Sequence, residues 1–267
     1  MSRPRPRPPL GQHFLSDATL LNNIANTLDP ETGDVVLEIG AGRGALTRVL
    51  APRVGTLVAI ERDPALASAL AQELAGSHAH VTIVQGDALR LDWHVLTGGV
   101  AAFKVIGNIP YYITSPLIEK ALTPPLPRSV VFLVQREVAD RLAAPPGSPS
   151  YGALSVGVQA AARVERLFII KAGAFRPPPR VDSALVRLTP LERPLVTPEE
   201  TAAFRAFVAA CFSRRRKQLR NAVMAATGAS GSAVAALLER LGLDPMSRPE
   251  VITPDGFARL LRASRQL

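Results

Sequence analysis

The run Asn108-Ile109-Pro110-Tyr111-Tyr112 contains the residue types from which an amine-binding site can be built. The N6 amine of adenine is a poor nucleophile, because its lone pair is delocalised into the ring. The side-chain oxygen of Asn108 and the backbone carbonyl of Ile109, in a turn stiffened by Pro110, could accept its two N–H groups and turn the lone pair out of the ring plane. Tyr111 could stack on the base, a contact worth roughly 1–3 kcal/mol. Proximity and orientation would then carry most of the rate, without a strong general base.

A glycine-rich turn, Glu38-Ile39-Gly40-Ala41-Gly42-Arg43-Gly44, follows a predicted strand and precedes a predicted helix. Gly40, Gly42 and Gly44 would let a ligand approach the backbone closely, and the helix N-terminus adds partial positive charge. Glu61, which lies 21 residues after Gly40, suits a pair of ribose hydroxyls. The same spacing also fits the fingerprint of nicotinamide-binding proteins. The turn alone therefore indicates a nucleotide-type cofactor without identifying it.

Two further carboxylates, Glu38 and Asp87, favour S-adenosylmethionine over a nicotinamide cofactor. Glu38 could neutralise a sulfonium or α-amino cation, which a pyrophosphate does not supply. Asp87 could accept a hydrogen bond from the adenine amine, although taken alone it could equally be a helix N-cap. With Glu61, these carboxylates end three successive predicted strands, and open α/β sheets bind ligands at that edge. The Asn108 run, which in isolation fits an ordinary turn with a buried Tyr, follows the next strand.

A second aromatic residue, Phe175, precedes the proline-rich basic loop Arg176-Pro177-Pro178-Pro179-Arg180. Phe175 could close the other face of the base, or it could be a core residue beside an exposed hinge. Arg176 and Arg180 are candidates for contacts with phosphates.

Short β-rich runs alternate with helical stretches from Asp34 to about Leu188, which is the pattern of βαβ units around a largely parallel sheet. The predicted strands are Val35–Ile39, Leu57–Ile60, Val81–Val84, Phe103–Ile106, Val130–Val134, Leu167–Ile170 and Ala184–Leu188. The predicted helices between them are Ala45–Ala51, Pro64–Ala75, Ser115–Ala121 and Arg136–Ala143. Leu122–Arg128 and Ala144–Ser150 are rich in Pro, Gly and Ser and are predicted to be loops.

After Pro190 the pattern changes to helices only, separated by glycine and proline. The predicted helices are about Pro198–Phe212, Arg215–Ala226, Ser232–Leu241 and Pro254–Arg262. We therefore expect a basic flexible arm over residues 1–10, a cofactor-binding α/β domain over residues 11–190, and a small all-α domain over residues 191–267.

The net charge of +9 is concentrated at the two ends of the chain. Arg3, Arg5 and Arg7 contribute +3 and residues 191–267 contribute +5, whereas residues 8–190 contribute only +1. This distribution favours an anionic partner such as RNA. The basic run expected to contact phosphates consists of Arg214, Arg215, Arg216, Lys217 and Arg220. A solvated helix face is the alternative for such a run.

The single cysteine, Cys211, cannot form an intramolecular disulfide, and no spacing of His and Cys suits zinc. The basic N-terminus has no apolar core behind it, and no run reaches about 18 apolar residues. We expect a cytoplasmic protein with no metal, and nothing in the sequence demands more than a monomer.

The sequence resembles the ribosomal RNA adenine N6,N6-dimethyltransferases, specifically the KsgA type that acts on small-subunit rRNA. The resemblance covers nearly the whole chain. Besides the glycine-rich turn, it includes Gly11-Gln12-His13-Phe14-Leu15, Asn108-Ile109-Pro110-Tyr111, Gln135-Arg136-Glu137-Val138-Ala139, Tyr151-Gly152-x-Leu154-Ser155, Phe175-x-Pro177-x-Pro179-x-Val181-Asp182-Ser183 and Phe212-Ser213-x-Arg215-Arg216-Lys217-x-Leu219-Arg220-Asn221.

The resemblance implies a Rossmann-like class I methyltransferase domain that uses S-adenosylmethionine, followed by a helical RNA-binding domain. The implied reaction is dimethylation of two adjacent adenosines in the 3′-terminal hairpin of small-subunit rRNA, within an assembling subunit. The family's cofactor contacts would fall on His13, Leu15, Gly40, Glu61, Asp87 and Asn108. At the position of His13 the family usually has Asn. A histidine there can still donate a hydrogen bond.

Three other functions fit parts of the sequence. The erythromycin-resistance methyltransferases modify large-subunit rRNA and are similar through the catalytic domain, but Ser213–Asn221 resembles the small-subunit family. A noncatalytic RNA-binding assembly factor on the same fold would show a decayed cofactor loop or Asn108 turn, and both are intact. A nicotinamide-dependent oxidoreductase is supported only by the glycine-rich turn and Glu61.

Overall fold

The chain is described by a computed structural model over residues 13–100, 102–213 and 217–267. Contacts divide it into two compact units, Met1–Ala139 with Glu165–Thr189, and Asp140–Val164 with Pro190–Leu267. The second unit thus takes in residues 140–164, which the sequence places in the cofactor-binding domain. Side chains of this stretch, such as Tyr151 and Val156, are buried in the core of the C-terminal helices, and no change of composition marks them. The predicted arm over residues 1–10 lies outside the described residues.

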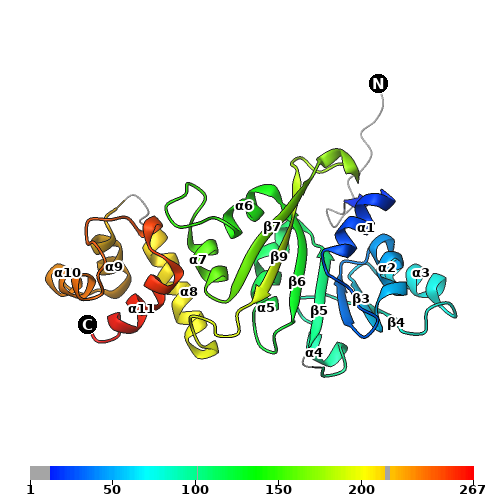
Figure 1. Ribbon diagram of the computed structural model, residues 1–267, viewed down its shortest axis with the longest axis horizontal. Helices are drawn as coiled ribbons and strands as arrows, with labels where there is room; N and C mark the ends of the chain where they lie inside the picture. The colour runs from blue at the N-terminus through cyan, green and yellow to red at the C-terminus, as the bar shows by residue number, and fades with distance from the viewer. Residues whose placement is uncertain (1–12, 101, 214–216) are drawn as a thin grey trace. The chain divides into compact units, whose positions relative to one another are not determined.

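A seven-stranded sheet dominates the described part of the α/β region (Figure 1). Its strands are β2 (Val35–Ile39), β3 (Thr56–Glu61), β4 (Val81–Gln85), β5 (Phe103–Asn108), β6 (Ser129–Gln135), β7 (Ala162–Ile170) and β9 (Ser183–Pro190). Their order across the sheet is β4-β3-β2-β5-β6-β9-β7. Every predicted strand is confirmed, and the neighbouring pairs from β4 to β6 are parallel, whereas β6 and β9 are antiparallel.

The helices that accompany the sheet include the four predicted ones and others that the sequence reading missed. They are α1 (Ala18–Asn26), α2 (Ala45–Leu50), η1 (Ala51–Arg53), α3 (Pro64–Leu74), α4 (Trp93–Leu96), η2 (Tyr111–Ile113), α5 (Thr114–Ala121), α6 (Arg136–Leu142) and η3 (Ala172–Ala174). Asp63 shows how such a helix is set in place, because its carboxylate accepts from the backbone N–H groups of Ala65 and Leu66 at the start of α3.

The core of the first unit forms where helices pack on the sheet. Buried residues of α1 and α2, including Ile24 and Leu50, share one cluster with strand residues such as Val36 and Ile106. The central strands β2 and β5 are buried over almost their whole length, as expected for parallel strands covered on both faces. This packing leaves the carboxyl ends of the strands as the place where polar side chains can emerge.

The second unit is helical. Beyond the end of α6 it contains α7 (Ala153–Gln159), α8 (Pro198–Ser213), α9 (Leu219–Thr227), α10 (Gly231–Arg240), η4 (Pro249–Val251) and α11 (Pro254–Ser264). The helix predicted from Arg215 starts later than expected among the described residues. Gln218 is its N-cap, and α9 begins at Leu219. The Tyr151 hydroxyl donates to the Ile252 carbonyl at 2.8 Å inside this core.

Among the described residues, no single helix is long and apolar enough to cross a membrane, and α9 and α10 meet those criteria only as a pair bent by 117°.

Candidate active site

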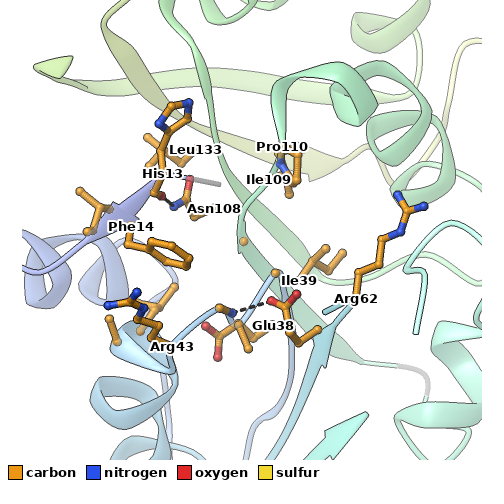
Figure 2. Close-up of a pocket in the computed structure, with 18 of the residues that line it drawn as sticks. His13, Phe14, Glu38, Ile39, Arg43, Arg62, Asn108, Ile109, Pro110 and Leu133 are labelled. Atoms are coloured by element: carbon orange, nitrogen blue, oxygen red, sulfur yellow. Dashed lines mark hydrogen bonds between the residues drawn. The ribbon is translucent and has the colours of Figure 1, made fainter. Parts of the chain in front are cut away.

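A cavity of about 1020 Å³ opens where β2, β3, β4 and β5 end. Its volume is at the upper end of the range typical of small-molecule and cofactor sites, about 300–1,000 Å³. Figure 2 shows Asn108 and the Ile109–Pro110 turn across the cavity from Glu38, with Phe14 and Arg43 on one side and Arg62 on the other. The chain therefore has a hollow at the edge of the sheet where the sequence predicts a cofactor.

Most of the predicted site residues line this cavity. Those from the cofactor set are His13, Leu15, Glu38, Gly40, Gly42, Glu61, Asp87 and Asn108. Those from the amine set are Asn108, Ile109, Pro110 and Tyr111, and Arg176 also reaches the lining. The parallel register explains the convergence, because Ile39 lies opposite both Ile60 and Gly107, so the carboxyl ends of three strands are level.

The glycine-rich turn uses backbone conformations that favour glycine. Gly40 and Gly42 have φ values of 77° and 58°. A Cβ at Gly40 would lie 3.1 Å from the Asn108 carbonyl oxygen, and one at Gly42 would lie 3.1 Å from the Phe14 ring. Glycine at these two positions lets the turn pass close to Asn108 and Phe14 in the wall of the cavity.

Glu61 is fixed by the backbone around it. Its side chain is buried, and its two carboxylate oxygens accept from the backbone N–H groups of Gly42 at 2.7 Å and Asp63 at 2.8 Å. Because a carboxylate has about four lone-pair positions, Glu61 can still accept two further hydrogen bonds from a ligand. The bond from Gly42 also ties the glycine-rich turn to the end of β3.

Glu38 is the most perturbed carboxyl group at the site. It is 2% exposed, and its Oε2 is buried without a hydrogen-bond partner among the described residues. Burial raises the pKa of Glu38 to about 7 and the Glu61 charge adds to this rise, while the Thr47 side chain and the Arg48 guanidinium oppose it. An unpartnered buried carboxyl oxygen is costly and calls for a cationic or hydrogen-bonding ligand.

Asp87 is bonded within its own loop through one of its two carboxylate oxygens. Its Oδ1 accepts from the backbone N–H of Leu89 at 3.0 Å, which closes the turn after β4. No donor among the described residues bonds to its Oδ2. One oxygen of Asp87 therefore shapes its own loop, and the other is available to a ligand in the cavity.

Asn108 and Ile109 each present an acceptor that is unused among the described residues. The Asn108 Nδ2 donates to the His13 carbonyl at 3.0 Å. Because a carbonyl can only accept, this bond determines how the amide is turned and leaves Oδ1 as an acceptor. Among the described residues, no donor bonds to Asn108 Oδ1 or to the Ile109 carbonyl, whereas the Pro110 carbonyl accepts from Ile113 N–H.

Tyr111 is held from two directions. Its hydroxyl lies 2.6 Å from the Ser183 Oγ, and its ring is stacked on that of His13 with centroids 6.0 Å apart. Burial raises the pKa of Tyr111, and the Ser183 hydrogen bond opposes this rise. The His13 Nδ1 lies 2.7 Å from the Pro177 carbonyl oxygen, so this ring is also anchored. The site thus presents a neutral, oriented aromatic ring next to the two acceptors.

Phe175 is not part of the cavity lining. It is fully buried in the same core cluster as Leu15 and Leu185, in a strand pair that opposes Leu15 to Phe175. Of the two alternatives for Phe175, the structure therefore fits a core residue. Exposing a buried Phe side chain to reach a base would cost about 1.5–3 kcal/mol. The neighbouring Arg180 is exposed and also lies outside the cavity lining.

Gly44, from the predicted cofactor set, also lies outside the cavity lining. It caps the N-terminus of α2 with a φ of 75°, and a Cβ there would lie 2.3 Å from the Leu70 Cδ1. Gly44 is therefore required for close packing of α2 against α3 and not for contact with a ligand.

The substitution Gly44→Ala is expected to lower the free energy of unfolding by about 1–3 kcal/mol more than Gly76→Ala does, as measured in urea. Gly76 is the matched control, because its φ is 82° and a Cβ there meets nothing within 4 Å. Both variants carry the same backbone penalty, so the difference isolates the collision with Leu70. Equal losses in the two variants would show that Gly44 is not a packing residue.

The sequence reading missed Phe14, Arg43, Arg62 and Tyr112, all of which line the cavity. Phe14 belongs to β1 (Phe14–Leu15), which pairs antiparallel with β8 (Phe175–Arg176). The Arg43 guanidinium lies 4.9 Å from the centre of the Phe14 ring, and Arg62 donates to the Tyr112 hydroxyl at 3.2 Å. Strands of two residues have no readable period, so no signal in the sequence could have found this pairing.

The basic run is described only at its end. Arg214, Arg215 and Arg216 lie outside the described residues. Lys217 is exposed, whereas Arg220 is half-buried in α9 and its Nε is shielded without a partner among the described residues.

Comparisons with known proteins agree with this geometry. The profile of the family described as ribosomal RNA adenine dimethylase matches residues 4–257. A Geobacter metallireducens protein named ribosomal RNA small subunit methyltransferase A is 41% identical over 98% of this chain and 97% of its own. A crystal structure of a dimethyladenosine transferase from Plasmodium falciparum is 27% identical with a TM-score of 0.83, over 95% of this chain and 98% of that one. The crystal structure of the 23S rRNA methyltransferase ErmE is also 27% identical, with a TM-score of 0.74 over 95% and 100%.

The fold and the site define a Rossmann-like methyltransferase, with a mostly parallel sheet and a cavity at the ends of its strands. More particularly, the chain belongs to the ribosomal RNA adenine dimethylase family. It is thus an enzyme of a family whose fold implies the use of S-adenosylmethionine.

Proposed function

We propose that this enzyme transfers methyl groups from S-adenosylmethionine to the N6 amines of two adjacent adenosines in the 3′-terminal hairpin of small-subunit rRNA, within an assembling subunit in the cytoplasm. The observation that carries the proposal is the pair of unused acceptors, Asn108 Oδ1 and the Ile109 carbonyl, at the edge of the cavity. Two acceptors are what an amine with two N–H groups needs.

The residues of the cavity fit S-adenosylmethionine. Glu38 has a buried oxygen without a partner, which suits a sulfonium or α-amino cation. Glu61 would accept from the ribose hydroxyls and Asp87 from the adenine amine, while the backbone of Gly40 and Gly42 would line the cofactor site. His13 and Leu15 complete the proposed cofactor contacts. When bound, this cofactor would supply an electrophilic methyl group.

The protein's own residues would orient the amine. Asn108 Oδ1 and the Ile109 carbonyl would each accept one N–H of the target adenine, so that the nitrogen lone pair leaves the ring plane. Tyr111, anchored by Ser183, would stack on the base that has left its helix. Pro110 holds the turn that presents the carbonyl, with φ of −60°. The proton released after transfer would pass to water, and no strong base is required.

The helical unit is proposed to bind RNA. Lys217 and Arg220 would contact phosphates together with Arg214, Arg215 and Arg216, and Arg176 and Arg180 would do so from the loop after Phe175. This division assigns the cofactor to the α/β part of the chain and much of the RNA contact to the helices, in a protein that acts as a monomer.

The choice of the small subunit rests on the relatives. The Geobacter protein named for the small subunit is 41% identical, whereas the structure named for 23S rRNA is 27% identical. A noncatalytic assembly factor would have no use for unpartnered acceptors beside a carboxylate-lined cavity, and a nicotinamide enzyme would have no use for the buried Glu38.

The proposal is tested by transfer of a radiolabelled methyl group from S-adenosylmethionine to ribosomal subunits that lack this modification. We expect label in small subunits and none in large subunits. Label in large subunits alone would support the large-subunit alternative, and binding of the cofactor without label in either subunit would support a noncatalytic assembly factor.

A further inference from the structure

Two consecutive tyrosines at the site are held in different ways. Tyr111 is half-buried and its hydroxyl bonds Ser183, whereas Tyr112 is 59% exposed. Both lie in η2, where successive side chains point about 120° apart because the helix has three residues per turn. Both also line the cavity, so one ring is anchored inside it and the other lies at its solvent-exposed rim.

Tyr112 is a tethered aromatic surface. Several large hydrophobic residues are exposed in the described part of the chain, and Tyr112 is the one aromatic residue among them. Its hydroxyl accepts a hydrogen bond from the Arg62 Nη1 at 3.2 Å. Arg62 follows Glu61 at the end of β3 and also lines the cavity. An exposed ring held in one place by a cation offers both a stacking face and a positive charge, which are the two features that single-stranded nucleic acid binds.

We propose that Tyr112 stacks on the base next to the target adenosine, and that Arg62 holds this ring and contacts the adjoining phosphate. The inference rests on the proposed function, in which the substrate has two adjacent adenosines. Neighbouring nucleotides would then meet neighbouring tyrosines, one base on Tyr111 inside the cavity and the next on Tyr112 at its rim. This assigns Tyr112 to substrate positioning, with no contact to the reacting atoms.

The first test compares Tyr112→Ala with Tyr112→Phe in methyl transfer to small subunits. Loss of the ring in Tyr112→Ala should raise KM for the subunit by about 5- to 150-fold, the range that the loss of one base–aromatic stack allows. Tyr112→Phe keeps the stacking ring and loses only the hydroxyl bond to Arg62, so its KM should rise by no more than about threefold. The Kd for S-adenosylmethionine, measured by calorimetry, should be unchanged in both. Val95→Ala, at a 70% exposed site on α4, serves as the surface control.

The second test uses small subunits in which uridine replaces one of the two adenosines, so that one target remains. Because the smaller base offers less surface for stacking on Tyr112, the replacement should raise the KM of the wild type. The KM of Tyr112→Ala, which has no ring at this position, should change little. Equal sensitivity of the two proteins would overturn the inference, as would an unchanged KM in Tyr112→Ala. If the Kd of Tyr112→Ala for S-adenosylmethionine rose as much as its KM for the subunit, the Arg62–Tyr112 pair would be a cofactor contact and the inference would be wrong. Absence of transfer by the wild type would contradict the proposed function itself.

Discussion

Asn108→Ala is expected to lower the rate of methyl transfer by roughly 10²–10³-fold, the loss typical of removing one oriented catalytic hydrogen-bond partner. The substitution removes Oδ1, one of the two unused acceptors at the site, and leaves the Ile109 carbonyl alone to hold an amine with two N–H groups. The lone pair of the target nitrogen would then stay largely delocalised. Single-turnover transfer with saturating cofactor and subunit measures this step directly.

A control is needed because Asn108 also donates to the His13 carbonyl. Its removal would loosen the segment around His13 and could weaken cofactor binding. Calorimetric titration with S-adenosylmethionine separates the two effects, and we expect a change in Kd much smaller than the change in rate. If Asn108→Ala transferred methyl groups at within about threefold of the wild-type rate, amine orientation by this residue would be wrong.

Glu38→Gln is expected to stabilise the cofactor-free protein above pH 7 while weakening its function. The pKa of Glu38 is about 7 in the folded chain and 4.5 is its ordinary value. Between these values the folded state holds a proton that the unfolded state has released, so the contribution of Glu38 to stability falls as pH rises from about 4.5 to 7 and is constant above it. At about 1.4 kcal/mol per pH unit, the buried carboxylate costs about 3 kcal/mol at pH 8.

Urea unfolding of wild type and Glu38→Gln at pH 5 and pH 8 checks this sign. We expect free energies of unfolding that differ by less than about 1 kcal/mol at pH 5, close to the ordinary pKa of Glu38, and a variant more stable by up to about 3 kcal/mol at pH 8. A variant that was less stable than the wild type at pH 8 would mean that the carboxylate has a stabilising partner in the folded chain.

Cofactor binding should change in the opposite direction. At pH 8 the Glu38→Gln variant is expected to bind S-adenosylmethionine about 10- to 150-fold more weakly, because it loses a hydrogen bond or ion pair to a charged group. The wild-type affinity should rise with pH through about 7, as Glu38 ionises, and the variant should lack that rise. S-adenosylhomocysteine has no sulfonium, so an equal loss for both ligands would assign Glu38 to the α-amino group.

The sheet and most of the cavity lining could be predicted because their signals are local. The strands are short runs rich in β-branched and apolar residues, such as the buried Val35–Ile39, and a parallel sheet brings the residues that follow such runs to one edge. Glu38, Glu61, Asp87 and Asn108 could therefore be grouped without knowing any distance. The helix α1 was not predicted, although its signals are also local, since Asp17 caps it and Leu21 and Ile24 recur on its buried face.

The parts that could not be predicted depend on contacts between distant segments. β1 and β8 each have two residues, and their pairing joins positions about 160 residues apart, which buries Phe175 instead of leaving it at the cavity. Residues 140–164 belong to the helical unit for the same kind of reason, because side chains such as Tyr151 are buried in its core. Gly44 could not be told from Gly40 and Gly42 because Leu70, which it packs against, lies 26 positions further along the chain.

Nucleoside analysis of the product tests the central claim most directly. Small subunits lacking the modification would be incubated with the wild-type protein and S-adenosylmethionine, and their rRNA would be digested and separated by liquid chromatography with mass detection. The orientation of an amine by Asn108 and Ile109 predicts N6,N6-dimethyladenosine from the two adjacent adenosines of the 3′-terminal hairpin. Methyl groups on a ribose oxygen or on another atom of a base would contradict it.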